Sequence, residues 1–203
     1  MLDHLVFATP DLEKSVAEIA EKWGVQPTPG GKHVGRGTHN ALLDLGNGGY
    51  LEIIGPDPDQ PEPSGPRGFG VDGLTAPRIA TWASKAPAIE ARVAAARDAG
   101  YDPGDPQAMS RDVPGGGRLN WKLTRNSAGD GLVPFLIDWG ETVHPSTTSA
   151  RGCRLVSLRA EHPEPDAIRK MLLALSENLD VIHGAAALLV ATFQTPNGTF
   201  ELR

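Results

Sequence analysis

His4 and Glu52 are two residues whose types and placement suit chemistry on a small molecule. Each lies in a short apolar run typical of a β-strand, within residues 2–8 and 50–54. The apolar side chains of each run share one strand face, so His4 and Glu52, with Tyr50 beside Glu52, take the opposite face. An imidazole and a carboxylate on one concave face are ligands suited to Zn, Mn, Fe, Co or Ni. Alternatively both are structural, with His4 bonding a backbone carbonyl and Glu52 pairing with an arginine.

Two further histidines are candidates for moving a proton. His39 stands beside Asn40 in a predicted strand over residues 38–45, where parity places Asn40 on the cleft side and His39 on the packed side. A bulge in the strand would reverse this assignment. His144 lies in a loop, where functional residues often occur. His144 and His39 are therefore the candidate acid/base residues. The other interpretation of His39 is a structural residue at the edge of the sheet or the rim of the core.

Aromatic and basic side chains are candidates for contacts with a bound molecule. Trp121 and Trp139 are spaced to lie on neighbouring strands and to wall a pocket for an apolar or aromatic molecule, although tryptophan more often packs in a core. The arginines suited to holding a carboxylate or carbonyl oxygen are Arg36, Arg118 and Arg125, of which we select Arg125. The alternative for each is a position on the solvated surface. With Asn40 and Tyr50, these residues form the predicted substrate-binding set.

The composition limits the classes of protein. The chain has 203 residues, 39% hydrophobic and 22% charged, with a formal charge of -6, so it can bury a core and is not a disordered chain. We find no cluster of Lys and Arg for a nucleic acid, no apolar stretch near the ~20 residues of a membrane span, and no signal-peptide pattern. One cysteine makes no internal disulfide. We expect a cytoplasmic protein with a small-molecule ligand and no nucleic-acid or membrane partner.

Turn residues, 24 Gly and 18 Pro, divide the chain into three units. Residues 1–56 and 78–140 each predict a strand, a helix and several strands, and residues 153–203 predict a shorter βαββ unit. This order recurs about every 75 residues, which is typical of duplicated supersecondary units. We therefore expect a single α+β domain over residues 1–203, with the helices packed on one face of the sheet.

Local signals define the first and last helices. Thr9 is a plausible N-cap, Pro10 suits the first helical position, and Gly24 is a natural stop. The Gly- and Pro-rich segment that follows, up to residue 37, is expected to be a loop. In the third unit, the spacing of apolar residues predicts a helix over residues 166–179.

Six short motifs, spread over nearly the whole chain, follow the pattern of one known superfamily. They are Leu2-Asp-His-Leu-Val6, Gly37-Thr-His-Asn-Ala-Leu-Leu43, Tyr50-Leu-Glu-Ile-Ile-Gly55, Pro134-Phe-Leu-Ile-Asp-Trp-Gly140, His144-Pro145 and Pro196-Asn-Gly-Thr-Phe-Glu-Leu202. In this ordered set the chain resembles the vicinal oxygen chelate superfamily, specifically its glyoxalase-like branch of the glyoxalase, bleomycin-resistance and dioxygenase type. The resemblance implies repeated βαβββ modules that form curved mixed sheets around a cleft, with helices on the outer face.

The resemblance also implies a divalent metal ion in the cleft. In metal-using members, a His on the first strand and a Glu on the last strand of a module bind an ion that chelates two neighbouring substrate oxygens. In this chain those positions are His4 and Glu52.

The second module departs from this metal pattern. Alignment of the two modules places Thr81 or Trp82 at the first-strand position, and neither is a good ligand. Asp138 completes the site in one alignment, whereas a shift of one residue places Ile137 there. Glu201, in a segment that looks like the superfamily's closing strand, is the other candidate ligand.

Two functions follow from this resemblance. The first is a metal-assisted enzyme acting on a small substrate with vicinal oxygen donors, by isomerase, lyase or dioxygenase chemistry. The metal would stabilise an oxyanion while His144 or His39 moves a proton. The alternative is a non-catalytic protein of the same fold that binds or sequesters a small molecule. By analogy with the fold, a homodimer is expected.

Overall fold

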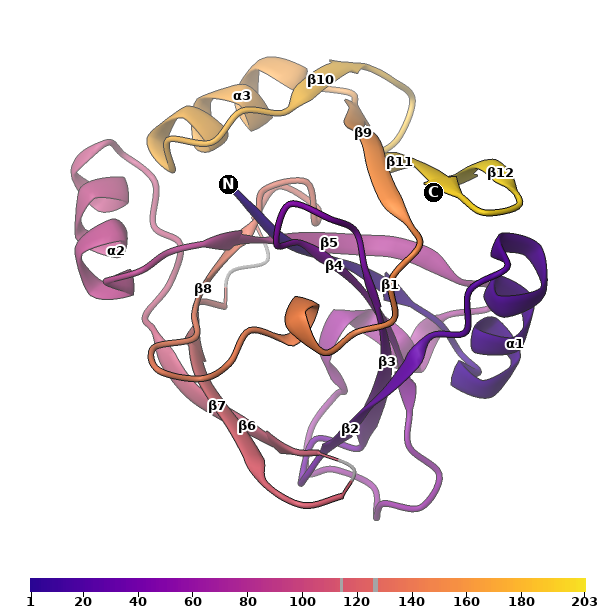
Figure 1. Ribbon diagram of the computed structural model, residues 1–203. Coiled ribbons are helices and arrows are strands. Elements are labelled where there is room, and N and C mark those ends of the chain that lie inside the picture. The colour runs from indigo at the N-terminus through magenta and orange to yellow at the C-terminus, as the bar shows by residue number, and fades with distance from the viewer. Residues whose placement is uncertain (114, 126–127) are drawn as a thin grey trace.

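Two β-sheets form the framework of the computed structural model, which describes residues 1–113, 115–125 and 128–203. One is a closed barrel of strands in the order β1-β4-β3-β2-β6-β7-β8-β5, and the other is a four-stranded sheet in the order β10-β9-β11-β12. Figure 1 shows α1 and α2 on opposite sides of the barrel and α3 beside the second sheet. The predicted α+β fold of repeated βαβββ modules around a cleft is confirmed.

Each half of the barrel comes from one contiguous βαβββ module. The first contains β1 (Leu2–Ala8), α1 (Leu12–Trp23), β2 (Thr28–His33), β3 (Thr38–Asp44) and β4 (Tyr50–Pro56). The second contains β5 (Arg78–Lys85), α2 (Ile89–Asp98), β6 (Gln107–Asp112), β7 (Arg118–Leu123) and β8 (Phe135–Asp138). The second sheet and its helix are β9 (Arg154–His162), α3 (Pro165–Ala174), β10 (Asp180–His183), β11 (Leu188–Thr195) and β12 (Gly198–Leu202). Short 3₁₀ turns occur at Gly68–Gly73 and Pro145–Thr147. Across the described residues, none of the helices has the length and apolar character needed to cross a bilayer.

The two modules meet at two seams of different length. β1 pairs with β5 along most of its length, whereas β2 and β6 meet through one pair, Lys32 and Asp112. Within each module the first strand runs parallel to the fourth, β1 to β4 and β5 to β8. A helix-containing crossover makes such parallel pairing possible. The long β1–β5 seam therefore fixes the two walls of the barrel against each other.

Strand parity separates the core from the barrel interior. Leu5 of β1 and Leu51 of β4 belong to a large buried cluster that also contains Trp23 of α1 and Phe193 of β11. The rings of Trp23 and Phe193 lie 4.9 Å apart, which packs α1 against the second sheet. The alternate side chains of β1 and β4 face inward, as the sequence pattern predicts.

The start of α1 differs from the prediction. The N-cap is Asp11, because its carboxylate accepts a hydrogen bond from the backbone N–H of Lys14 at 3.0 Å. Thr9 lies outside the helix, and its hydroxyl bonds to the hydroxyl of Ser15 at 2.7 Å. The predicted stop at Gly24 is confirmed, since this residue takes a left-handed conformation with φ of 75°.

Two strands lie where the sequence predicted none. The expected loop before residue 37 contains β2, whose glycines allow close approach to β6: a Cβ at Gly31 would lie 2.0 Å from the carbonyl oxygen of Asp112. Helix α3 ends at Ala174 rather than residue 179, because Ser176 turns the chain with a φ of 55°. The chain then forms β10, parallel to β9.

Candidate functional site

The interior of the barrel holds a cavity of about 950 Å³ that both modules line. The wall from the first module is polar and includes His4, His33, Asn40, Tyr50 and Glu52. The wall from the second module is mainly apolar and includes Trp121, Leu123, Phe135, Ile137 and Trp139. We call these the polar wall and the apolar wall. The two walls of the cavity therefore differ in polarity.

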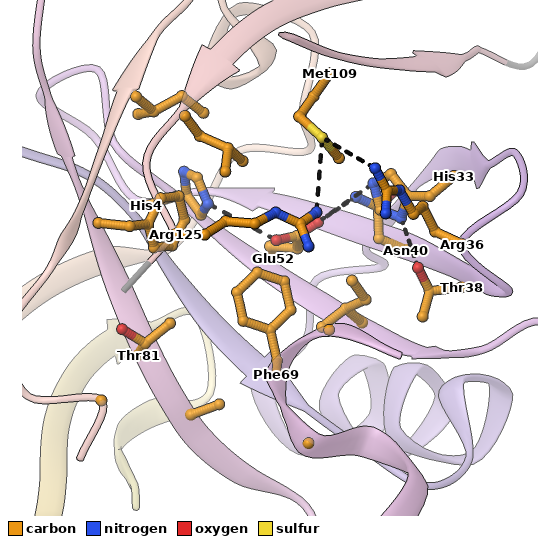
Figure 2. Close-up of a pocket in the computed structure, with 18 of the residues that line it drawn as sticks. His4, His33, Arg36, Thr38, Asn40, Glu52, Phe69, Thr81, Met109 and Arg125 are labelled. Atoms are coloured by element: carbon orange, nitrogen blue, oxygen red, sulfur yellow. Dashed lines mark hydrogen bonds and ion pairs between the residues drawn. The ribbon is translucent and has the colours of Figure 1, made fainter. Parts of the chain in front are cut away.

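Glu52 is the centre of the polar wall (Figure 2). Its exposed fraction is 7%, and Oε1 accepts a hydrogen bond from Nδ2 of Asn40 at 2.5 Å. Nε2 of His33 lies 3.9 Å from Oε1, and Nε2 of His4 lies 3.7 Å from Oε2. Both distances exceed a hydrogen bond. Among the described residues, Oε2 therefore receives no hydrogen bond and is available to a bound molecule.

The position of Asn40 depends on a glycine in the neighbouring strand. A Cβ at Gly30 would lie 2.1 Å from Oδ1 of Asn40, so only glycine leaves room for this amide. Oδ1 is buried and has no hydrogen-bond partner within the described residues. The bond from Nδ2 to Glu52 is therefore what orients the amide.

His33 belongs to the site, although the sequence analysis did not select it. It is the last residue of β2, and its Nδ1 lies 3.0 Å from Oγ1 of Thr38. Burial lowers the pKa of His33; the negative charge of Glu52 opposes this shift, while the charges of Arg111 and His39 add to it. His33 is therefore a neutral imidazole at neutral pH. No sequence signal identified it, because the segment that contains β2 has the composition of a loop.

Arg111 carries a buried positive charge into the cavity. Its exposed fraction is 4%, and its Nη1 has no hydrogen-bond partner within the described residues. Burial lowers the pKa of Arg111, while the neighbouring Glu52 and Tyr50 act in the opposite direction. A buried guanidinium nitrogen without a partner is costly, which makes Arg111 a candidate for contact with a bound anion. Arg111 was not among the site residues selected from the sequence.

His4 is held from behind by a buried carboxylate. Its Nδ1 lies 2.7 Å from Oδ1 of Asp3, and Oδ2 of Asp3 lies 3.0 Å from Nε2 of His144. Burial raises the pKa of Asp3, but the hydrogen bonds from His144 and His4 outweigh burial and hold this pKa well below its ordinary value. Ionised Asp3 accepts a hydrogen bond from the N–H group at Nδ1 of His4. Nε2 of His4 therefore presents its lone pair to the cavity.

A β-bulge places Asp3 beside His4. The pairing of β1 with β5 passes from Leu2 opposite Ser84 to His4 opposite Ala83, and Asp3 is the extra residue. Without the bulge, alternation would turn the Asp3 and His4 side chains to opposite faces. The ring of Tyr50 stacks on that of His4, with centroids 4.5 Å apart, and completes its support.

The predicted substrate-binding residues come together, and the predicted acid/base residues do not. The cavity is lined by all five of the former: Asn40, Tyr50, Trp121, Trp139 and Arg125. His144 lies behind His4 and contacts Asp3 rather than the cavity. His39 lies on the outer side of β3, where its Nε2 is 3.8 Å from Oε1 of Glu13 in α1. Neither histidine is placed to touch a molecule in the cavity.

The two additional metal-ligand candidates also lie away from His4 and Glu52. The carboxylate of Asp138 accepts the backbone N–H of Gly140 at 2.9 Å and points out of the barrel towards the start of α2. Glu201 lies on β12 of the second sheet and pairs with Arg203 at 2.8 Å. The structure therefore does not bring either carboxylate into the cavity.

The fold and the cavity define an α+β barrel with an internal cavity, and comparison with known proteins gives its family. The model of the glyoxalase-like domain family matches residues 2–176, so the chain belongs to that family. This confirms the resemblance to the vicinal oxygen chelate superfamily. No curated protein matches the chain.

Solved structures are similar to the chain at low sequence identity. A hypothetical protein from Staphylococcus aureus is similar with a TM-score of 0.69 and 12% identity, over 100% of this chain and 98% of that chain. The chain is also similar, with a TM-score of 0.46 and 16% identity, to a methylmalonyl-CoA epimerase from Streptomyces coelicolor in complex with 2-nitronate-propionyl-CoA, over 71% of this chain and 98% of that chain. A methylmalonyl-CoA epimerase from Mycobacterium tuberculosis has the same TM-score and identity, over 68% and 87%.

The register of the strands identifies the positions in the second module that correspond to His4 and Glu52. His4 lies eight residues before the first residue of α1, and Thr81 lies eight residues before the first residue of α2. On this alignment Val6 corresponds to Ala83, and their parallel partners are Glu52 and Phe135. Phe135, rather than Asp138 or Ile137, therefore takes the place of Glu52.

These residues do not fit the divalent metal that members of the superfamily commonly use. Thr81 and Phe135 supply no strong ligand opposite His4 and Glu52. Nowhere in the described ranges do three or more His, Cys, Asp or Glu side chains form a group that could hold an ion. The guanidinium of Arg111 already brings a positive charge close to Glu52. The positive charge available to a substrate oxygen is thus an arginine of the chain itself.

Proposed function

We propose that this protein is an enzyme that binds a small organic anion in the barrel and moves a proton at the carbon next to its carboxylate or carbonyl group. The observation that carries the proposal is the buried guanidinium of Arg111, whose Nη1 has no hydrogen-bond partner within the described residues and which lines the same cavity as the carboxylate of Glu52. Such a reaction needs a cation for the substrate oxygens and a base for the neighbouring C–H bond. These two residues supply both.

The charge of the cavity supports an anionic substrate. The whole chain carries a formal charge of -6. The charged residues that line the cavity nevertheless include four arginines, Arg36, Arg78, Arg111 and Arg125, against the two acids Glu52 and Asp130. A concave site with an excess of one charge attracts molecules of the opposite charge.

Glu52 is the proposed base. The C–H proton moves to the carboxylate, and the electron pair of that bond forms the C=C bond of an enolate, whose negative charge lies on oxygen. The donors of Arg111 stabilise this oxyanion, and the planar guanidinium can hold two neighbouring oxygens at once. Return of the proton to the same or an adjacent carbon completes an isomerisation without an oxidant. Asn40, through its 2.5 Å bond to Oε1, holds the carboxylate in place.

His4 is the proposed second proton-carrying group. Its Nε2 lies 3.7 Å from Oε2 of Glu52, so one substrate atom in the cavity beside these two atoms is within reach of both. Ionised Asp3 at Nδ1 stabilises the imidazolium that forms when Nε2 takes a proton. His4 can therefore accept or return a proton on the side of the substrate that faces β1.

The apolar wall supports a substrate with an apolar body. The rings of Trp121 and Trp139 lie 5.1 Å apart, and Phe135 contacts Phe69 with ring centroids 6.0 Å apart. Mostly apolar walls with a few polar groups are usual in small-molecule sites. The same wall favours the second candidate function, a protein that binds an aromatic or apolar anion without chemistry.

The experiment that separates these functions is hydrogen exchange in D₂O. A panel of 2-substituted carboxylates and 2-oxo acids is incubated with the protein, and loss of the proton next to the carbonyl carbon is followed by proton NMR. We expect exchange with the wild type and binding without exchange with Glu52→Gln. Binding without exchange by the wild type would instead support the binding protein.

A chelator tests the role assigned to Arg111. After dialysis against EDTA, exchange is expected to continue at its original rate, because the positive charge belongs to the chain. A loss of exchange that added Zn²⁺ or Mn²⁺ restores would contradict this assignment and favour the metal-assisted enzyme. The matched control for Glu52→Gln is Glu18→Gln, which changes an exposed acid of α1.

A further inference from the structure

Arg36 and Arg125 converge on one sulfur atom where the cavity meets solvent. Both residues are exposed and line the cavity. Nη2 of Arg36, in the β2–β3 connection, lies 4.0 Å from Sδ of Met109, and Nη2 of Arg125, after β7, lies 3.6 Å from the same atom. Figure 2 shows both side chains reaching towards Met109. A thioether is a weak acceptor, so this contact leaves most donors of both arginines unused.

The cavity arginines differ from most others in the chain. Ion pairs with carboxylates are formed by Arg67, Arg92, Arg97, Arg118, Arg159, Arg169 and Arg203. Within the described ranges, no such pair is formed by any of the four arginines that line the cavity. Arg151 and Arg154 also form none and lie outside it. The cavity thus gathers guanidinium groups that form no ion pair with a carboxylate of the described residues.

The two arginines at this opening come from different modules and act on each other. Burial and the positive charge of Arg36 lower the pKa of Arg125. Two like charges held close together are unfavourable, and an oxyanion between them would remove the repulsion. Guanidinium groups match the geometry of carboxylates and phosphates.

We infer that Arg36 and Arg125 form a second anion site, which binds a terminal carboxylate or phosphate group of the substrate. The inference rests on the proposed function and narrows its substrate class. The substrate is a bifunctional anion: one end lies at Arg111 and Glu52, its apolar body lies along the apolar wall, and its other charged end lies at the opening. The two anion sites fix its direction in the barrel.

The test compares three series of ligands with matched chain lengths. They are simple monocarboxylates, dicarboxylates with acids at both ends, and carboxylates with a terminal phosphonate. Dissociation constants are measured by calorimetry for the wild type, for the double variant Arg36→Met/Arg125→Met, and for the control double variant Arg97→Met/Arg118→Met. Because all these arginines are partly or fully exposed, circular dichroism is expected to show the same fold in each protein.

The expected result is a preference for two charged ends that depends on Arg36 and Arg125. At the best length, the wild type and the control bind a dianion roughly tenfold or more tightly than the matched monocarboxylate, the effect of one charge-assisted hydrogen bond. The double variant loses this preference but keeps its affinity for the monocarboxylate. A larger gain with the phosphonate assigns the terminal group as phosphate, and an equal or smaller gain assigns it as carboxylate.

Two outcomes would overturn the inference. A preference that persists in Arg36→Met/Arg125→Met, or that is absent from the wild type at every chain length, shows that the opening is not an anion site while the inner site stands. If the wild type binds neither monocarboxylates nor dianions, the proposed function fails together with the inference. Added salt provides a further check, since exposed charges are screened and the preference must shrink.

Discussion

The two walls of the barrel have the same order of elements and different chemistry. The polar wall carries an acid, an amide and two imidazoles on β1, β2, β3 and β4. At the positions that correspond to His4 and Glu52, the apolar wall has Thr81 and Phe135. The ring of Phe135 packs against that of His4 with centroids 5.5 Å apart. In a symmetric site these positions would carry a second imidazole and a second carboxylate.

This difference shows how a duplicated module can divide its roles. The shared backbone order closes the barrel, because the strand order is alike in both halves. The side chains at equivalent positions then decide what each half does. In the proposed function, the polar wall holds the groups that move protons, and the second module supplies the apolar wall and the inner cation, Arg111. The predictions below test this division one residue at a time.

The largest effect is expected for Glu52→Gln. The amide has nearly the shape of the acid but accepts no proton, so exchange should fall by roughly 10²- to 10⁴-fold, the usual contribution of a general base. Binding of the substrate anion should be retained or slightly tighter, because a negative charge leaves the cavity. NMR exchange and calorimetry measure the two effects separately. Exchange that persists in this variant would place the base elsewhere.

Arg111→Met is expected to lower the affinity for anions and to raise the thermal stability of the unliganded protein. Loss of the guanidinium should weaken anion binding by about tenfold to a hundredfold. The melting temperature of the unliganded protein should rise, because an apolar chain replaces a buried charge whose Nη1 has no hydrogen-bond partner within the described residues. Arg118→Met, an exposed arginine paired with Asp112, serves as the control. A lower melting temperature for Arg111→Met would show that this charge is satisfied in the unliganded protein.

Gly30→Ala tests whether the polar wall depends on close packing of β2 against β3. The added methyl group would lie 2.1 Å from Oδ1 of Asn40 and must displace the amide that holds Glu52. Overpacking of this kind costs about 1–3 kcal/mol of unfolding free energy, and exchange should fall with it. Gly65→Ala is the control, since no atom lies within 4 Å of its added carbon. Equal stability of the two variants would contradict the assigned role of Gly30.

Alternation of apolar residues explains which site residues the sequence could identify. Leu5 and Phe7 in β1, and Leu51 and Ile53 in β4, fix one face of each strand as core. The side chains of His4, Tyr50 and Glu52 must then lie on the opposite face, because a shift of the strand by one residue would turn every polar side chain into the core. Asn40 was placed in the same way, on the face opposite to Ala41 and Leu43 of β3. These four residues are therefore the part of the site that the alternation of apolar residues within single strands could identify.

The rest of the site depends on contacts that one strand does not encode. β2 reads Thr-Pro-Gly-Gly-Lys-His, and its pairing depends on the close approach of β3 and β6, so His33 had no local signal. β6 has no apolar alternation, so the inward direction of Arg111 could not be assigned. Asp3 reaches His4 only through a bulge. The residue of the second module that corresponds to Glu52 could likewise be assigned only from the observed pairing of the strands, which selects Phe135 instead of Asp138.

The smallest predicted effect concerns the stability of the polar wall at mildly acidic pH. Because burial lowers the pKa of His33 in the folded protein, the unfolded chain takes up its proton first as the pH falls below about 6.5. Stability is therefore full above that pH and decreases below it, by at most about 1.4 kcal/mol per pH unit from this group. The pKa of Asp3 is lowered from a value near 4, so the contribution of Asp3 to stability is lost only at lower pH.

Denaturant unfolding between pH 7 and pH 5 should show a shallower decline of the unfolding free energy for His33→Gln than for the wild type. His183→Gln, at an exposed position of β10, should follow the wild type, and an equal slope in all three proteins would show that His33 is not buried as a neutral imidazole.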